Sequence, residues 1–183
     1  MMKTLRLILI LSLCAVLMSC RGASQTVTGY AFHDLVVDFP SSCEITKLEE
    51  QDSPPLASFV LVDKDNADSQ IEFAISEFDK DFLSTVPREE LMGELVASVF
   101  DMKENVLSAP GVVAEKIGEM TVSRKGERPE AYMFITVSEK GKTVYVILSS
   151  MIVGNYNITT ASRASDPSTM EMFTTITDNI RIL

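Results

Sequence analysis

The chain has 183 residues with 26 acidic and 16 basic side chains, which give it a net charge of −10. Nucleic-acid phosphates and anionic lipid both repel so acidic a surface, so neither is expected as a ligand of the folded domain. The three cysteines, Cys14, Cys20 and Cys43, cannot form a disulfide framework, because Cys14 is expected to leave with an N-terminal leader and Cys20 to carry lipid, as described next. The fold must therefore depend on its hydrophobic core.

The first 20 residues have the pattern of a lipoprotein signal peptide. Lys3 and Arg6 precede the apolar run 7–18, and the segment ends in Leu17-Met18-Ser19-Cys20. A positive start, a short apolar middle and a small residue before the cut are typical of secretion signals, and a cysteine directly after the cut is typical of bacterial lipoproteins. The run is shorter than the roughly 20 apolar residues that span a bilayer. We therefore expect cleavage after residue 19 and lipid, palmitate included, on Cys20.

Removing the leader would leave 164 of the 183 residues, a length that suits one domain with a sizeable core. We expect a short tether at 20–28 and one globular domain at 29–183. Cleavage removes two basic and no acidic residues, so the mature charge becomes −12. The lipid must then anchor the protein without help from basic side chains.

The first half of the domain is predicted to be mainly strands. Apolar residues alternate along 35–40, which predicts a strand that Pro40 ends, and 44–48 forms a short second strand. The polar stretch 51–55 is predicted as a loop. Strands at 59–62 and 71–78, joined by the polar turn 63–69, form a hairpin with one solvated face.

Two helices and a meander are predicted in the second half. One helix begins after Pro87, carries apolar residues four apart and fades near Asn105. One or two short strands interrupted at Gly118 follow in 112–122. The meander at 131–162 is apolar on both faces, so both faces must be covered. Asp166 and Pro167 then begin a final helix, with Asp166 as the N-cap.

A helix on each face of an antiparallel sheet makes the predicted fold class α+β, arranged as an α/β/α sandwich. This order of elements resembles the PsbP-like fold, which is named for an extrinsic photosystem II subunit, and within it the bacterial DcrB-type lipoproteins. The resemblance rests on the leader ending at Cys20, the strand Leu35-Val36-Val37-Asp38-Phe39-Pro40, the meander, and a final helix that ends in Thr177-Asp178-Asn179-Ile180-Arg181-Ile182-Leu183. It implies a non-enzymatic protein without a cofactor that binds or supports other envelope proteins.

The residues themselves offer few chemical candidates. Cys43 and the only histidine, His33, would be the nucleophile and base of an enzyme, although a small buried Cys and a surface His are the ordinary interpretations. The acidic stretch Asp63, Asp65, Asn66 and Asp68 is similar to a calcium loop, but Ala67 occupies a liganding position, the glycine is missing and the later glutamate is misplaced, so a hairpin turn is favoured. The basic residues Arg124, Lys125 and Arg128 form a cluster that would bind an acidic partner or lie at a solvated hairpin tip.

Three functional hypotheses follow. The first is a binding or accessory module for another envelope protein, and the second is a carrier of an apolar ligand between a helix and the sheet. The third is an enzyme that uses Cys43 and His33. Arg21 stands where an Asp retains lipoproteins in the inner membrane of some bacteria, so a periplasm-facing position on the outer membrane is favoured.

Overall fold

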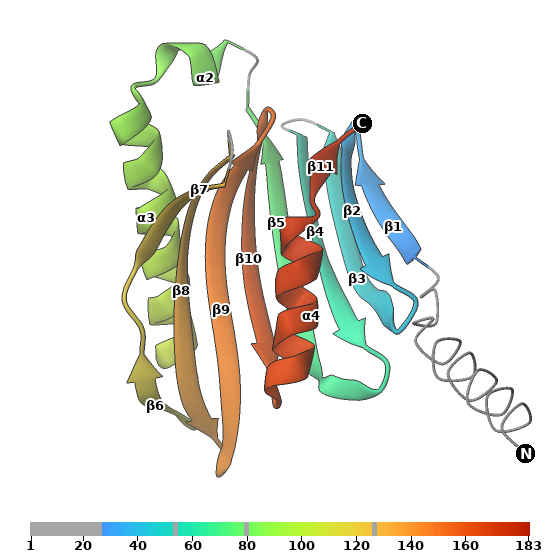
Figure 1. Ribbon diagram of the computed structural model, residues 1–183, viewed down its shortest axis with the longest axis vertical. Coiled ribbons are helices and arrows are strands. Elements are labelled where there is room, and N and C mark those ends of the chain that lie inside the picture. The colour runs from blue at the N-terminus through green and yellow to red at the C-terminus, as the bar shows by residue number, and fades with distance from the viewer. Residues whose placement is uncertain (1–26, 53–54, 79–80, 126–127) are drawn as a thin grey trace, which may run out of the picture.

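The computed structural model describes residues 27–52, 55–78, 81–125 and 128–183 (Figure 1). Eleven strands and three helices follow one another along this part of the chain. The strands are β1 (Val27–Phe32), β2 (Leu35–Pro40), β3 (Cys43–Asp52), β4 (Pro55–Asp63), β5 (Asn66–Glu77), β6 (Val112–Ile117), β7 (Thr121–Lys125), β8 (Arg128–Glu139), β9 (Lys142–Val153), β10 (Tyr156–Ala164) and β11 (Arg181–Ile182). The helices are α2 (Phe82–Thr85), α3 (Arg88–Leu107) and α4 (Pro167–Asp178).

Eight strands form one antiparallel sheet in the order β3-β4-β5-β10-β9-β8-β6, with β7 also paired to β8. The predicted meander is confirmed as β8, β9 and β10. Lys140 and Gly141 connect β8 to β9, and both have positive φ, 52° and 78°. This conformation matches the twist of a two-residue hairpin turn. The hairpin of β4 and β5 is confirmed as well, and its turn at 63–66 fits the turn predicted for the acidic stretch.

The smaller sheet, β1-β2-β11, was only partly predicted. The strand at 35–40 is confirmed as β2, but β1 begins at Val27, inside the segment expected to be a tether. The final helix stops at Asp178, and Arg181–Ile182 pairs with β2, so the prediction that the helix runs to Leu183 was wrong. A two-residue strand is too short to show an apolar period.

The loop predicted at 51–55 was wrong at its two ends, which lie in strands, and its positions 53–54 fall outside the described residues. Strand β3 continues to Asp52, which pairs with Pro55 at the start of β4. Strand β3 lies at the edge of the sheet, and its residues from Thr46 to Asp52 are exposed. Exposed residues can be polar, and this polar composition is what predicted a loop. Backbone pairing with β4 holds the strand in place without burying its side chains.

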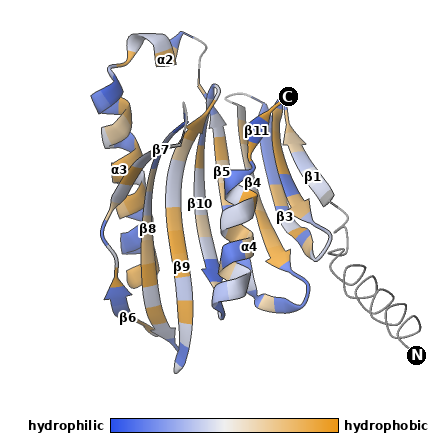
Figure 2. Cartoon of the chain, viewed as in Figure 1, coloured by the Kyte–Doolittle hydropathy of each residue, from blue (hydrophilic) through white to orange (hydrophobic). Residues whose placement is uncertain are grey.

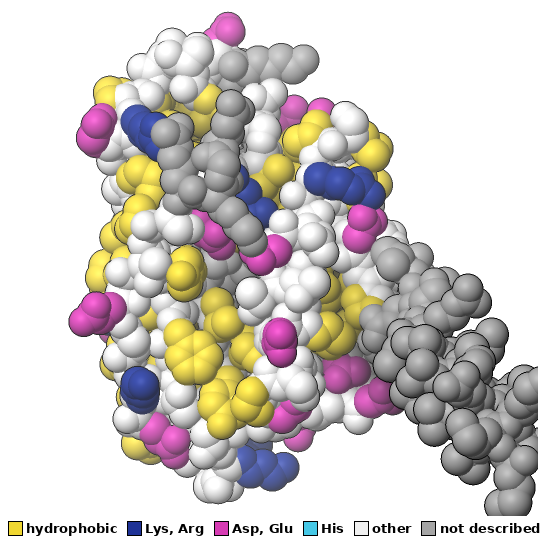
Figure 3. All heavy atoms as spheres, viewed as in Figure 1, with side chains coloured by type: hydrophobic (Ala, Val, Ile, Leu, Met, Phe, Trp, Pro, Cys, Tyr) yellow, Lys and Arg dark blue, Asp and Glu magenta, His cyan; other side chains and the backbone are white. Residues whose placement is uncertain are grey.

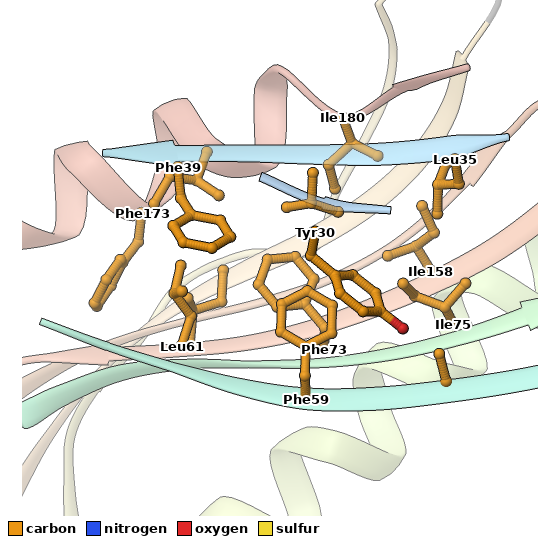
Figure 4. Packing of buried hydrophobic residues seen from close by; sticks show 14 of the residues in the cluster. Tyr30, Leu35, Phe39, Phe59, Leu61, Phe73, Ile75, Ile158, Phe173 and Ile180 are labelled. Atoms are coloured by element: carbon orange, nitrogen blue, oxygen red, sulfur yellow. The ribbon is translucent and has the colours of Figure 1, made fainter. Parts of the chain in front are cut away.

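A helix covers each face of the large sheet, as predicted, but α4 shares its side with the small sheet (Figure 1). On the α4 side, the larger core joins β1, β2, β4, β5, β10 and α4, and Figure 4 shows Tyr30, Phe39, Phe59 and Phe173 packed between the two sheets. On the α3 side, Leu95 and Val99 pack on β8 and β9. Orange segments alternate with pale or blue ones along several strands in Figure 2, which fits strands whose faces differ in polarity.

The two long helices begin as their sequences predict. Asp166 caps α4 by accepting a hydrogen bond from the Thr169 amide at 2.9 Å, and Pro167 takes the first helical position. Helix α3 begins after Pro87, with Glu89 and Glu90 in its first turn, where the helix dipole favours acidic groups. Among the helices within the described ranges, none combines the length and the apolar character needed to cross a membrane.

Candidate functional site on the face of β8 and β9

Beside α4, one face of β8 and β9 carries one exposed aromatic side chain with three half-buried apolar neighbours. Tyr132 and Phe134 on β8, with Tyr145 and Ile147 on β9, form what we call the aromatic patch. Phe134 pairs with Ile147 across the strands, and the ring centroids of Phe134 and Tyr145 are 6.2 Å apart. Figure 3 shows hydrophobic side chains gathered over β8 and β9 on this side of the molecule.

The patch exists because α4 packs mainly on β10 and β9. The helix end lies beside Arg128 and Glu130 at the start of β8, and Phe134, farther along the strand, stays exposed. Phe134 is 37% exposed, while Met133 and Ile135, on the opposite face of the same strand, are buried under α3. Successive residues of a strand point to opposite faces, so alternation divides β8 into a core face and an open apolar face. An exposed aromatic side chain among half-buried aromatic and aliphatic ones is a feature of interaction sites.

A cavity of about 270 Å³, lined mainly by residues with hydroxyl or carboxylate groups, adjoins the patch between the sheet and the C-terminal half of α4. Tyr132 and Ile147 line both features. Ser149 and Thr160 share a hydrogen bond of 2.8 Å in its floor, and the buried side chain of Glu130 also lines it. The hydroxyl and carboxylate oxygens make this cavity suited to groups that donate hydrogen bonds.

Arg128 fastens the end of α4 beside this cavity. Its Nη1 donates hydrogen bonds to the carbonyl oxygens of Thr177 at 3.2 Å and Asp178 at 3.5 Å. A cation at the C-terminal end of a helix satisfies carbonyls that have no partner within the helix and interacts favourably with the dipole. Its Nη2 lies 3.8 Å from Glu130 Oε2, and the side chain is only 13% exposed. Arg128 therefore does not belong to a solvent-facing basic tip.

For Arg124 and Lys125, the other two members of the predicted basic cluster, the structure describes only the backbone. Arg124 pairs with Pro129, and Lys125 pairs with Arg128, across the end of the β7–β8 hairpin. The hairpin prediction for this segment is confirmed. The proposed role of the cluster in binding an acidic partner stays a prediction.

The structure separates His33 from Cys43. His33 lies in the turn before β2, with φ of 54°, its ring stacked on Phe32 and its Nδ1 2.8 Å from Glu77 Oε2. Cys43 follows the other end of β2, so the length of that strand, about 17 Å, lies between them. Burial raises the pKa of the Cys43 thiol, whereas a nucleophile needs a lowered pKa. The pairing of these two residues in one active site was wrong.

The acidic stretch forms the β4–β5 turn. Asp63 is buried and accepts a hydrogen bond from the Asp65 amide, Asn66 donates to the Ser165 hydroxyl, and Asp68 lies 3.8 Å from Lys142. These side chains engage different neighbours and form no shared group. Within the described residues, no three His, Cys, Asp or Glu side chains form a group that could hold a metal ion. Cys20, the predicted lipidation site, lies outside the described residues.

The aromatic patch was missed by sequence reasoning. The alternation of Tyr132 and Phe134 against Met133 and Ile135 was visible, but both faces were expected to be covered. A signal was present in the residue types, because the open face carries aromatic residues and the buried face carries mainly aliphatic ones. The extent of α4 decided which of these faces stays open.

Comparison with solved structures places this arrangement in a known fold. The chain is similar to the cyanobacterial PsbP protein, CyanoP, of Synechocystis sp. PCC 6803, with a TM-score of 0.56 at 12% identity, over 90% of this chain and 96% of that one. It has a PsbP-like α+β fold. Weaker likenesses are LpqN of Mycobacterium tuberculosis, involved in cell envelope biogenesis, and a protein of unknown function from Pseudomonas aeruginosa.

The LpqN match has a TM-score of 0.49 at 13% identity over 88% of this chain and 87% of that one. The match to the Pseudomonas protein has a TM-score of 0.34 at 11% identity over 83% and 91%. No family model and no curated protein matches the sequence. At these identities the likeness concerns the fold, and function must be argued from the site.

Proposed function

We propose that this protein is a lipid-anchored, non-enzymatic accessory protein of the bacterial cell envelope that binds another envelope protein through the aromatic patch. The observation that carries the proposal is the open aromatic face of β8 and β9 beside a cavity lined with hydrogen-bond acceptors. Aromatic side chains surrounded by polar groups are enriched at protein interfaces. The leader supports anchoring through Cys20 and a position facing the periplasm, with the outer membrane favoured.

Charge favours a different protein over the other possible occupants of the patch. The mature chain carries −12, so a second copy of this chain would bring like charge to the same face. Anionic lipid is disfavoured for the same reason, and Glu130 and Asp178 line the cavity beside the patch. The occupant is therefore an apolar segment of another protein that also donates hydrogen bonds to the cavity.

Site-specific photo-crosslinking in living cells tests this proposal. A photoreactive phenylalanine analogue placed at position 134 should give an adduct with one discrete protein. The matched control is the same analogue at Phe100, which is 42% exposed on α3, on the opposite side of the sheet. The Cys20→Ala variant should lose the adduct, because the anchor holds the protein beside its partner.

The partner identified in this way should then be purified for affinity measurements. Tyr145→Ser should weaken binding about thirtyfold, the effect of removing a hot-spot side chain worth about 2 kcal/mol. Phe100→Ser should leave the affinity unchanged. Equal adducts from positions 134 and 100, or equal affinities for the two serine variants, would refute the proposed interface.

A further inference from the structure

On the α3 side of the large sheet lies a second cavity, of about 490 Å³. We call it the α3 groove. Met102 and Val106, near the C-terminal end of α3, form one wall, and Val144 and Val146 of β9 form the base beneath them. The helix packs mainly on β8 and β9, so the groove continues past it over β10 and β5.

Small side chains line the part of the groove that α3 leaves open. Ala74 on β5 is exposed, and Thr159 and Ala161 on β10 are partly buried. The volume lies within the range of about 300–1,000 Å³ that is typical of ligand pockets, which are mostly apolar with a few polar groups. The groove volume is roughly sixteen times the 30 Å³ that a water molecule occupies. This is enough space for a chain of about a dozen carbon atoms.

One basic side chain and two acidic ones line the same groove. Arg163 Nη2 donates a hydrogen bond to Glu139 Oε2 at 2.6 Å, whereas Arg163 Nε is buried and has no hydrogen-bond partner. A buried N–H group without an acceptor is unfavourable, so this atom favours a ligand that brings an acceptor oxygen. Glu72 also lines the groove, so its lining holds two carboxylates and one guanidinium, and an anionic head group is repelled.

We propose that the α3 groove binds an uncharged single-chain amphiphile of the monoacylglycerol type. The acyl chain lies along the wall of Met102, Val106, Val144 and Val146, and a hydroxyl or ester oxygen accepts the hydrogen bond of Arg163 Nε. This site is on the opposite face of the sheet from the aromatic patch and does not depend on the proposed function.

Photoaffinity labelling in intact cells tests the site. The probe is a monoacylglycerol with a photoreactive diazirine in its acyl chain and a terminal alkyne for detection. The wild-type lipoprotein should be labelled on peptides that contain residues 102–109 or 144–163. Labelling confined to other peptides, or no labelling above that of an unrelated lipoprotein, would overturn the proposal.

Three variants sharpen the test. Ala74→Trp fills the open part of the groove and should lower labelling at least about tenfold, the effect of displacing two buried methylene groups. Its control is Ala97→Trp, at an exposed position of α3 outside the groove, which should be labelled like the wild type. Arg163→Lys keeps the positive charge but removes Nε, and should lower labelling about fivefold, the effect of one hydrogen bond.

A fatty-acid probe of the same chain length should label the protein less than the neutral probe, because its carboxylate faces Glu72 and Glu139. Equal labelling of wild type and Ala74→Trp, or stronger labelling by the fatty acid, would refute the assignment. Thermal melts establish that the variants are folded. The crosslink from position 134 should persist in all three variants, so failure here is distinguishable from failure of the proposed interface.

Discussion

Replacing Phe173 with alanine should destabilise the whole described domain. Phe173 lies on α4 with none of its surface exposed, and Figure 4 shows it beside Phe39 and Leu61 in the larger core. Truncating a fully buried phenylalanine costs about 3–5 kcal/mol through lost apolar burial and the cavity that remains. Native proteins have unfolding free energies of about 5–15 kcal/mol, so this variant loses a large share of its stability.

Urea denaturation followed by circular dichroism measures the effect. With a slope of about 2 kcal/mol per molar urea, a loss of 4 kcal/mol lowers the midpoint by about 2 M. The matched control is Phe100→Ala, because Phe100 is 42% exposed on α3, and its cost should stay below about 1 kcal/mol. A midpoint shift for Phe173→Ala no larger than that of the control would refute the placement of α4 on the core.

Three further predictions concern single side chains. Hydrogen bonds from Ser168 and Thr169 lower the pKa of Asp166 in the folded protein. The stability that this N-cap contributes is therefore fully present above the unfolded pKa of about 3.9, and it is lost as the pH falls through the lower folded pKa. Asp166→Ala should cost about 1 kcal/mol at pH 7 and almost nothing in strong acid, as urea melts at each pH can establish. Burial raises the Cys43 pKa, so iodoacetamide at pH 8 should modify Cys43 in unfolded protein far faster than in native protein, as mass spectrometry can follow. Cys20→Ala should abolish incorporation of labelled palmitate, and label retained in this variant would contradict lipidation there.

Local patterns were enough to predict most of the architecture. The period of two in 71–78 and in the meander and the apolar spacing after Pro87 predicted strands and a helix that the structure confirms. The N-cap at Asp166 and the turn at Lys140-Gly141 are equally local signals. Each of these features depends on residues within one turn or one strand, so neighbouring residues suffice to specify it.

The pairing of distant segments could not be read in this way. Strand β11 exists because Arg181 and Ile182 pair with Val36 and Leu35, almost 150 residues earlier in the chain. Strand β3 continues through a polar stretch because β4 pairs with it. The separation of His33 from Cys43 likewise follows from where β2 runs, not from their spacing in the sequence.

The sequence by itself determined the acidic charge, the leader pattern, the single thiol of the domain and most of the succession of strands and helices. Only the tertiary structure decided which apolar faces stay open. Helix α4 leaves Phe134 exposed and its patch neighbours half-buried on one face, and α3 leaves the groove beside Ala74 open on the other. Periodicity shows that a face is apolar, but whether it is covered depends on where a helix distant in the chain packs, and burial is a property of the folded whole.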